Sequence, residues 1–510
     1  MSKIRNLLNI SYCRYYCVQR AKKKVPIISC KRPEYNHFDG QTYGKFEVIK
    51  LASQGWLHPK SKNDYFTIYG ETNKTETSVY KKSFEEIGLS EELIDVVSQQ
   101  GYTLPTAIQA RSFSPIMQGF NTAITAETGC GKTLAYLLPI LQQIASWKPH
   151  IAEEFNSPLA VVITPSRELA TQLGEIAQNI SEHLNINVST LVGGKTKKKI
   201  IDPPIEYTDL MIASLGAFSK LVTTGIIKIH NVHHVVLDEA DTLLDDSFIE
   251  KLVALMKKFR IHFKCEMKAP PEGCQITLVS ATLPHELPES VSAFMDPQSL
   301  RTVATDKIHR ILPHIPHKIY IIGFFSLKEK SLFLRLGKAQ KPGELLKLVQ
   351  ADLNLKRQVM VFSNKTSTCD FVSMFLNENG IKCLNINGKM AVPLKAGNMD
   401  LFKSGKVQVI SSTDVASRGL DTTGVSHIIN YDFPLYTSDY IHRCGRTGRL
   451  GSPQDSSVTN FVAWPREVQL VQKIEEAVRR NNELPNVNAN IKRQITNRIM
   501  KMSGVKSRGI

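Results

Sequence analysis

Residues 126–133 read Ala126-Glu127-Thr128-Gly129-Cys130-Gly131-Lys132-Thr133 and stand between a short apolar run and a long apolar segment. They follow the phosphate-loop pattern GxxxxGK[ST] except at the first position, where alanine replaces glycine. In such a loop the backbone N–H groups surround phosphate oxygens, Lys132 reaches the outer phosphates, and the Thr133 hydroxyl ligates Mg²⁺. The stretch therefore predicts a strand, a phosphate-binding loop and a helix in succession, which is a unit of α/β folds.

The rest of the body repeats this alternation. From residue 84 onward, short β-branched runs alternate with longer amphipathic segments, which is typical of βα units around parallel sheets. The runs lie at 123–125, 159–163, 234–237, 276–279, 359–362, 407–410 and 427–429. An irregular stretch, Asp306–His317, separates the first four runs from the last three. We therefore expect two α/β domains at residues 84–305 and 318–483, joined by a linker at 306–317.

The composition narrows the class of protein. Of the 510 residues, 42% are apolar and 22% are charged, so the chain can bury a large core and is neither disordered nor fibrous. Eighteen consecutive apolar residues do not occur, so we expect no membrane span. The nine cysteines include no CxxC pair, which argues against a disulfide framework or a zinc site and favours a reducing compartment.

The net charge of +17 is concentrated at the two ends. Residues 1–33 hold nine Lys/Arg and residues 484–510 hold six, with no acidic residue in either segment. Residues 1–20 also place apolar side chains at helical spacing, which predicts a mitochondrial presequence over 1–33; the alternative is a disordered basic tail. The N-terminal extension at 34–83 shows no usable pattern. The basic tail at 484–510 is either a phosphate-binding extension or an inert solvated end.

A second polar cluster, Asp238-Glu239-Ala240-Asp241, directly follows the apolar run at 234–237. Ligands of open α/β sheets sit at the carboxyl ends of the strands, so this cluster is expected to face the phosphate loop. Asp238 is then the carboxylate on the metal side, and Glu239 is the general base that activates the attacking water. Taken alone, the four residues could also form an exposed loop or a helix cap.

At this point the sequence resembles the DEAD-box RNA helicases of superfamily two, over about residues 84–465. The resemblance implies two tandem RecA-like domains, each a mostly parallel sheet flanked by helices, that close on ATP and bend a single RNA strand. Gln109, at the end of the segment 101–109, matches the family's Q motif, with Phe84 at the upstream aromatic position. An amide can pair with adenine, so ATP is expected to be preferred over GTP.

The resemblance also assigns roles in the second half of the site. Asp421 falls at the ribose-contacting position, and Arg446 and Arg449 fall where the family's arginine fingers touch the γ-phosphate. The residues expected to couple the catalytic carboxylates to the domain interface are Asp241, Ser280, Thr282 and His442. Because the arginines and the phosphate loop belong to different domains, hydrolysis is expected to require closure.

For RNA, the resemblance selects Pro165, Arg167, Gly193, Gly194, Ser363 and Thr413. Backbone amides, hydroxyls and an occasional arginine contact phosphate and sugar without reading bases, so sequence preference is expected to be weak. The segment 214–217 departs from the family pattern, because Ala217 stands where the family has arginine. Lysines at 195 and 197–199 either compensate for this loss or form a solvated charged face.

These patterns predict an RNA-dependent ATPase, with ATP and Mg²⁺ as cofactors, that opens short RNA duplexes or rearranges RNA–protein complexes. The expected location is the mitochondrial matrix, with nucleus and cytoplasm as alternatives. The resemblance to organellar members makes mitochondrial ribosomal RNA or a pre-ribosomal particle the leading substrate, in ribosome assembly. The alternatives are an ATP-dependent RNA clamp or assembly platform with incidental turnover and, less favoured by the Q motif and residues 238–241, a DNA-translocating ATPase.

Overall fold

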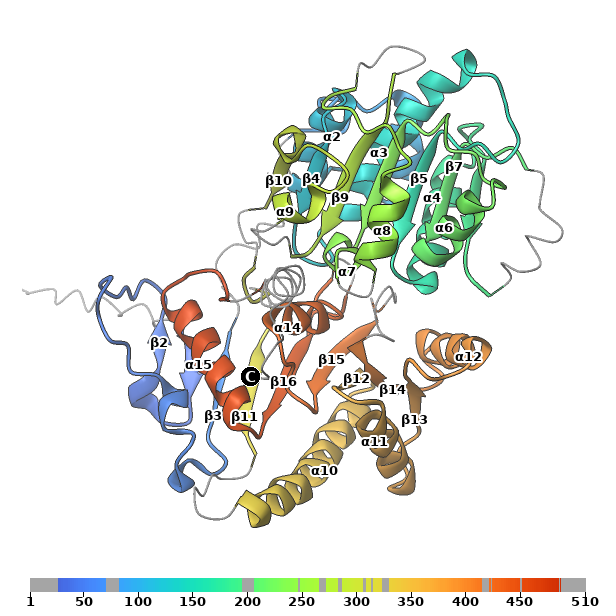
Figure 1. Ribbon diagram of the computed structural model, residues 1–510. Coiled ribbons are helices and arrows are strands. Elements are labelled where there is room, and N and C mark those ends of the chain that lie inside the picture. The colour runs from blue at the N-terminus through green and yellow to red at the C-terminus, as the bar shows by residue number, and fades with distance from the viewer. Residues whose placement is uncertain are drawn as a thin grey trace, which may run out of the picture.

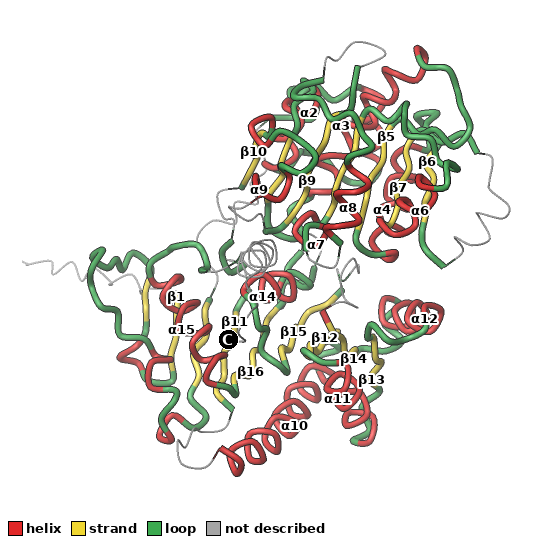
Figure 2. The backbone as a smooth tube through the Cα atoms, in the orientation of Figure 1, coloured by secondary structure: helices red, strands yellow, loops and turns green. Residues whose placement is uncertain are grey.

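The structure is a computed structural model. It describes residues 26–69, 82–194, 206–245, 248–265, 272–282, 287–305, 309–312, 315–322, 330–414, 422, 424–449, 452–485 and 487. Two α/β domains lie one above the other in Figure 1, and their sheets are flanked by helices (Figure 2). The two predicted domains of α/β class are therefore present.

The first domain is built on a seven-stranded sheet in the order β10-β4-β9-β8-β5-β7-β6, and all its neighbouring strands are parallel. The strands are β4 (Thr122–Thr125), β5 (Ala160–Thr164), β6 (Val188–Leu191), β7 (Leu210–Ser214), β8 (His234–Asp238), β9 (Gln275–Ser280) and β10 (Arg301–Ala304). The central strands β5 and β8 are buried along their whole length. This burial explains their continuous apolar runs, because helices cover both faces of a parallel sheet.

Helices pack on both faces of this sheet and form two hydrophobic clusters, one on each side. They are α1 (Glu91–Gln99), α2 (Ala107–Met117), α3 (Lys132–Trp147), α4 (Arg167–Ser181), α6 (Leu215–Thr223), α7 (Ala240–Leu243), α8 (Ile249–Met256) and α9 (Leu287–Val291). Short 3-10 turns follow α3 at Lys148–His150 and precede β10 at Pro297–Ser299. The helix α3 is apolar nearly all round, as expected for a helix held between the sheet and other helices.

The second domain contains six parallel strands in the order β13-β14-β12-β15-β16-β11. They are β11 (His317–Ile321), β12 (Gln358–Ser363), β13 (Cys383–Ile386), β14 (Val409–Thr413), β15 (Val425–Asn430) and β16 (Ser457–Val462). The helices are α10 (Lys330–Asn354), α11 (Thr366–Glu378), α12 (Val392–Lys403), α14 (Thr437–Cys444) and α15 (Pro465–Arg479). The strand β11 begins at His317, the last residue of the predicted linker.

The sheet of the second domain continues into the N-terminal part of the chain (Figure 1). Beyond β11 it adds β3 (Tyr65–Ile68), β1 (Pro26–Cys30) and β2 (His37–Phe38), all antiparallel to their neighbours. The strand β1 thus lies in the predicted presequence 1–33, and β2 and β3 lie in the extension 34–83, which shows no usable pattern. These strands are hard to predict from sequence, because they are only two to five residues long and their sheet is completed by the distant strand β11.

This N-terminal segment, residues 26–69, packs tightly against α15. Trp56 and Phe66 are fully buried in the same cluster as the apolar face of α15. Short 3-10 turns at Pro33–Tyr35, Ala52–Gly55 and Pro59–Ser61 complete the segment. The buried Glu475 carboxylate accepts hydrogen bonds from the backbone N–H groups of Ala52 and Ser53, at 2.8 and 3.0 Å. The chain therefore runs from the second domain into the first and back again.

The described residues hold no helix with the length and apolarity that a membrane crossing requires. The folded body extends past the predicted start of the basic tail at residue 484. The N–H of Leu484 donates to the carbonyl of His309 at 2.8 Å, and Val487 is buried in the core of the second domain.

Candidate active site at the junction of the two domains

The phosphate loop has the predicted position between β4 and α3. Gly129 and Gly131 have φ angles of +84° and +90°, in the left-handed region that favours glycine. The Lys132 ammonium donates to the carbonyls of Ala126 and Glu127, at 2.7 and 2.8 Å. The loop thus wraps around its own lysine at the start of α3, which is the helix end that attracts anions.

Gln109 lies against this loop. Gln109 forms a capping box with Thr106 at the start of α2, and its Nε2 donates to the Gly131 carbonyl at 3.2 Å. An amide nitrogen has two N–H groups and an amide oxygen can accept twice, so capacity for a further partner remains. Phe84 is 3% exposed and packs in the core of the first domain. Its assignment to the nucleotide site therefore stays a prediction.

The acidic cluster follows β8 as predicted. The Asp238 carboxylate accepts from the Glu239 N–H through Oδ1 at 2.8 Å and from the Tyr136 hydroxyl through Oδ2 at 2.9 Å. Burial, together with the nearby Glu239 charge, raises the pKa of Asp238 to about 6 even though both hydrogen bonds act in the opposite direction. Glu239 has φ +52°, a strained value for a residue with a side chain. Such strain at a strand end is common in functional sites.

Asp241 of the first domain pairs with His442 of the second domain. Its Oδ2 lies 2.9 Å from Nε2 of His442, on α14 of the second domain, and also accepts from the Thr282 hydroxyl. The Ser280 hydroxyl donates to the Thr282 carbonyl at 2.9 Å and so orders this turn. Burial alone raises the pKa of Asp241, but the His442 charge and the hydrogen bonds outweigh it and hold the pKa well below its usual value. The four predicted coupling residues therefore lie together.

The two predicted arginine fingers also reach the first domain. The Arg446 guanidinium, 4% exposed, lies 3.8 Å from the Glu239 carboxylate. A side chain on Gly129 would come within 2.9 Å of the Arg449 Cα, and one on Gly445 would overlap the Thr128 hydroxyl. The segment 445–449 therefore packs directly on the phosphate loop, so the two domains are in a closed arrangement.

Arg443, which sequence analysis did not select, organises the second domain's side of the junction. It is 2% exposed and donates to the Asp414 carboxylate, the Asn364 amide oxygen and the Asp432 carbonyl. It thereby ties α14 to the ends of β12, β14 and β15. Its spacing from Arg446 and Arg449 gave no sign of this separate role.

Among the predicted RNA-contacting residues, the structure groups those of the first domain. The Arg167 guanidinium, at the first residue of α4, lies beside Gly193 and Gly194, where an added Cβ would be 3.2 and 3.3 Å from it. Pro165, just before α4, is half-buried. In the second domain, Ser363 is fully buried at the end of β12 and Thr413 is 7% exposed at the end of β14.

Of the remaining residues, two are buried and others lie outside the described part of the chain. The Ser363 hydroxyl is buried without a hydrogen-bond partner in the protein, and its assignment to RNA stays a prediction. Ala217, at the family's arginine position, is 3% exposed in the core, so its own side chain does not supply the contact of the family's arginine. Asp421 and the lysines at 195 and 197–199 lie outside the described residues.

One contact across the junction was not predicted. Lys395 on α12 donates to Glu168 on α4 at 2.8 Å, next to Arg167.

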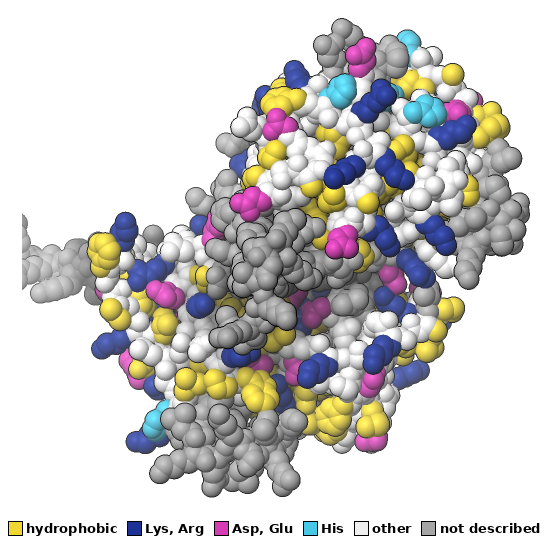
Figure 3. Space-filling model, viewed as in Figure 1, with side chains coloured by type: hydrophobic (Ala, Val, Ile, Leu, Met, Phe, Trp, Pro, Cys, Tyr) yellow, Lys and Arg dark blue, Asp and Glu magenta, His cyan; other side chains and the backbone are white. Residues whose placement is uncertain are grey.

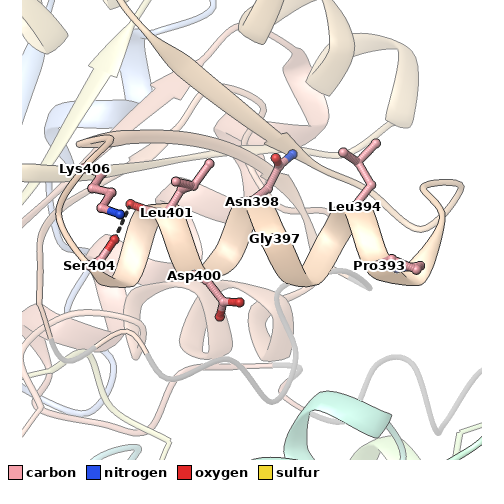
Figure 4. A pocket seen from close by; sticks show the side chains of 8 residues that line it. All are labelled: Pro393, Leu394, Gly397, Asn398, Asp400, Leu401, Ser404 and Lys406. Carbon is pink, nitrogen blue, oxygen red and sulfur yellow. Dashed lines mark hydrogen bonds between the residues drawn. The ribbon is translucent and has the colours of Figure 1, made fainter.

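A shallow pocket of about 610 Å³ also lies along α12, and Figure 4 shows Leu394 and Leu401 among its lining side chains. None of the residues lining this pocket belongs to the predicted site. The chemistry therefore gathers at the junction of the domains.

Comparisons with known proteins agree with this geometry. The DEAD/DEAH box helicase family matches residues 106–291, and the helicase conserved C-terminal domain matches residues 340–451. The protein named "Probable ATP-dependent RNA helicase DDX28" is 35% identical in Mus musculus and 34% in Homo sapiens, over 91% of this chain and 86% of each relative. S. cerevisiae Dbp5 bound to RNA and ADP BeF3 has a TM-score of 0.64 at 22% identity, covering 82% of this chain and 100% of that chain, and shares the fold.

The chain therefore belongs to the DEAD-box family of RNA helicases. It is an RNA-dependent ATPase with the two RecA-like domains of that family.

Proposed function

We propose that this helicase hydrolyses ATP only when the two domains are closed, and that closure on RNA opens short duplexes or displaces bound proteins. The observation that carries the proposal is the contact set across the junction. Asp241 meets His442, Glu239 faces Arg446, and Gly445 packs on the phosphate loop. Catalytic groups from both domains thus stand within one site, which opening would dismantle.

In the proposed mechanism, the loop amides and Lys132 hold the phosphates. Lys132 exchanges its two loop carbonyls for phosphate oxygens when the nucleotide enters. Arg446 and Arg449 approach the terminal phosphate from the second domain, an effect worth roughly 10³–10⁵ in rate in related phosphoryl transfer. Gln109 reads the adenine edge. The proposed ribose contact of Asp421 belongs to the same set.

Glu239 is the group that orients and deprotonates the attacking water. One of its carboxylate oxygens, Oε2, is buried without a hydrogen-bond partner in the protein. Buried polar atoms almost always have a partner, so this oxygen fits a site that a substrate water completes. The Thr128 hydroxyl in the phosphate loop is buried in the same way and fits a contact with the nucleotide.

The residues also fit a magnesium ion. Thr133 stands in the first turn of α3, and Asp238 is a buried carboxylate at the end of β8. Hydroxyl and carboxylate oxygens, with phosphate oxygens, are the ligands that Mg²⁺ prefers. When bound, the ion offsets the negative charge of the phosphates. Thr133 and Asp238 are the residues that would hold it.

RNA binding is proposed to run across both domains with weak sequence preference. Arg167, Gly193 and Gly194 offer a guanidinium and backbone N–H groups, which suit phosphate contacts. Thr413 is proposed for the second domain. On the face drawn in Figure 3, Lys and Arg side chains lie on both domains near the junction, interspersed with acidic ones. Such a surface favours contacts with the RNA backbone over recognition of the bases.

The biological substrate is proposed to be mitochondrial ribosomal RNA or a pre-ribosomal particle. The support is the basic, acid-free composition of residues 1–33 and the family membership. Because β1 begins at Pro26 and lies in the sheet, removal of a presequence is expected to occur before that residue. Crosslinking the protein to RNA in isolated mitochondria tests substrate and compartment together, and absence from mitochondria would overturn this assignment.

The experiment on mechanism is Glu239→Gln, with the exposed Glu250→Gln on α8 as matched control. The expected result is a loss of roughly 10²–10⁴ in RNA-stimulated ATP hydrolysis, with RNA binding in the presence of a non-hydrolysable ATP analogue retained. A second candidate function is an RNA clamp with incidental turnover. The observation that favours it is the buried Ala217, which stands where the family has an arginine. If the Glu239→Gln protein replaces the wild type fully in cells, the clamp is correct.

A further inference from the structure

One buried polar group in the site has no role in the mechanism above. Tyr136 on α3 is fully buried, with its ring in the core of the first domain. Its hydroxyl donates to Oδ2 of Asp238 at 2.9 Å. A buried hydroxyl needs a partner, but the partner here is the carboxylate that we place next to the metal.

The position of Tyr136 along α3 is informative. Residues three and four apart lie on one side of a helix, so Tyr136 stands one turn below Lys132 and Thr133. The same helix face therefore carries the phosphate lysine, the proposed metal hydroxyl and the tyrosine. Through the Tyr136 hydroxyl, this face also contacts the end of β8, where Asp238 lies.

The two hydrogen bonds to Asp238 act on different oxygens. The Glu239 N–H holds Oδ1 at 2.8 Å, and the Tyr136 hydroxyl holds Oδ2 at 2.9 Å. The terminal torsion of an aspartate is broad, so a carboxylate fixed at one oxygen can still rotate. With both oxygens held, the plane of the carboxylate is set relative to α3, and its remaining lone pairs point in fixed directions.

We propose that Tyr136 is a positioning residue for Asp238, which it orients toward the Mg²⁺ held with Thr133 at the phosphate loop. This proposal rests on the metal site proposed above. Hydrogen bonds from residues behind a metal ligand commonly change metal affinity 10- to 100-fold, because they fix the ligand and stabilise its charged form. Phenylalanine at this position would fill the same core space without orienting the carboxylate.

The test compares Tyr136→Phe with Thr277→Val. Thr277 is also fully buried in the first domain, and its hydroxyl lies 2.9 Å from Nε2 of His234, away from the phosphate loop. Each substitution removes one buried hydroxyl and keeps the shape of the side chain. The measurement is the affinity for a fluorescent ADP, titrated once with Mg²⁺ and once with a chelator.

Wild-type protein is expected to bind the ADP more tightly with Mg²⁺. For Tyr136→Phe, the affinity in chelator is expected to stay within about twofold of the wild type, while the gain from Mg²⁺ falls about tenfold. The half-saturating Mg²⁺ concentration for RNA-stimulated hydrolysis should rise by a similar factor. Thr277→Val should change neither the gain in ADP affinity from Mg²⁺ nor the half-saturating Mg²⁺ concentration. A Tyr136→Phe protein with an unchanged gain from Mg²⁺ overturns the proposal.

A third variant separates this proposal from the one on which it rests. Asp238→Asn should abolish the gain from Mg²⁺ if the metal site is correct. If Asp238→Asn keeps that gain, the metal assignment itself is wrong and the role of Tyr136 falls with it. If Asp238→Asn loses the gain and Tyr136→Phe keeps it, the metal site stands and only the positioning role is rejected.

Discussion

His442 and Asp241 lie 2.9 Å apart although they belong to different domains and are separated by 201 positions in sequence. The same oxygen of Asp241 accepts from Thr282, so the contact connects α14 of the second domain to the turn after β9 in the first. A bond of this kind exists only when the domains are closed. It therefore couples the site of the first domain to the closure of the second domain.

Removing the imidazole should weaken the coupling between nucleotide and RNA. For His442→Ala, we expect the gain in RNA affinity caused by a non-hydrolysable ATP analogue to fall by about 5- to 150-fold, the usual range of coupling between sites. RNA titrations with and without the analogue measure this gain. His442→Gln keeps a donor and should recover part of it, and an unchanged gain in His442→Ala would contradict the closure model.

The ion pair between Glu168 and Lys395 should make a smaller contribution to closure. Both side chains are partly exposed, at 28% and 14%, so the pair is worth about 0.5–1 kcal/mol. Glu168→Lys or Lys395→Glu alone should lower analogue-dependent RNA affinity at least two- to threefold, and the two together should restore much of it. The exposed pair Glu344 and Lys347 on α10 is the control, because swapping it should have no effect.

Glu475 should be essential to the attachment of the N-terminal segment. It is fully buried, accepts from two backbone N–H groups of that segment, and pairs with Arg479 at 2.8 Å. Glu475→Ala leaves the buried guanidinium of Arg479 without its carboxylate partner and should lower the free energy of unfolding by about 3–5 kcal/mol. The neighbour Glu476 is half-exposed and pairs with Arg480, so Glu476→Ala should cost less than about 1 kcal/mol in the same urea titration.

His234 should make stability depend on pH in the acidic range. Burial lowers its pKa from 6.5 to about 3, and both ring nitrogens face partners, Gln143 and Thr277. Between these two values the unfolded chain binds a proton that the folded chain does not. The contribution of neutral His234 to the free energy of unfolding is therefore fully present above pH 6.5 and is lost as the pH falls toward 3. By pH 5 the free energy of unfolding is lower by about 2 kcal/mol.

The variant His234→Asn removes this proton uptake. Urea unfolding at pH 7.5 and pH 5 should show a loss of stability that is about 2 kcal/mol smaller in the variant than in the wild type. The exposed His150→Asn is the control and should leave the difference unchanged. An equal pH dependence in wild type and His234→Asn would show that His234 is not the group responsible.

The parts of the site that follow strands directly could be predicted from sequence. The phosphate loop and Asp238-Glu239-Ala240-Asp241 are local patterns whose surroundings are dictated by a strand before and a helix after, and the structure places both as expected. The seven apolar runs all became strands. Fully buried parallel strands read as continuous apolar runs, which explains this agreement.

What escaped prediction depends on contacts between distant segments. Arg443 and Lys395 look like ordinary charged residues until the fold brings Asp414 and Glu168 beside them. Phe84 and Ser363 matched family positions, but a match says nothing of how deeply a side chain is buried. The strands β1–β3 are too short for a clear alternation, and their register is set by β11.

The attachment of residues 26–69 to β11 also governs how the protein is made. During synthesis these residues emerge well before their partner strand β11, which follows β3 by roughly 250 positions. Native contacts of such long range form slowly, and Trp56 and Phe66 stay uncovered until then. The nascent chain is therefore expected to need chaperone protection at residues 26–69. Premature termination before β11 would leave these residues in an aggregation-prone fragment.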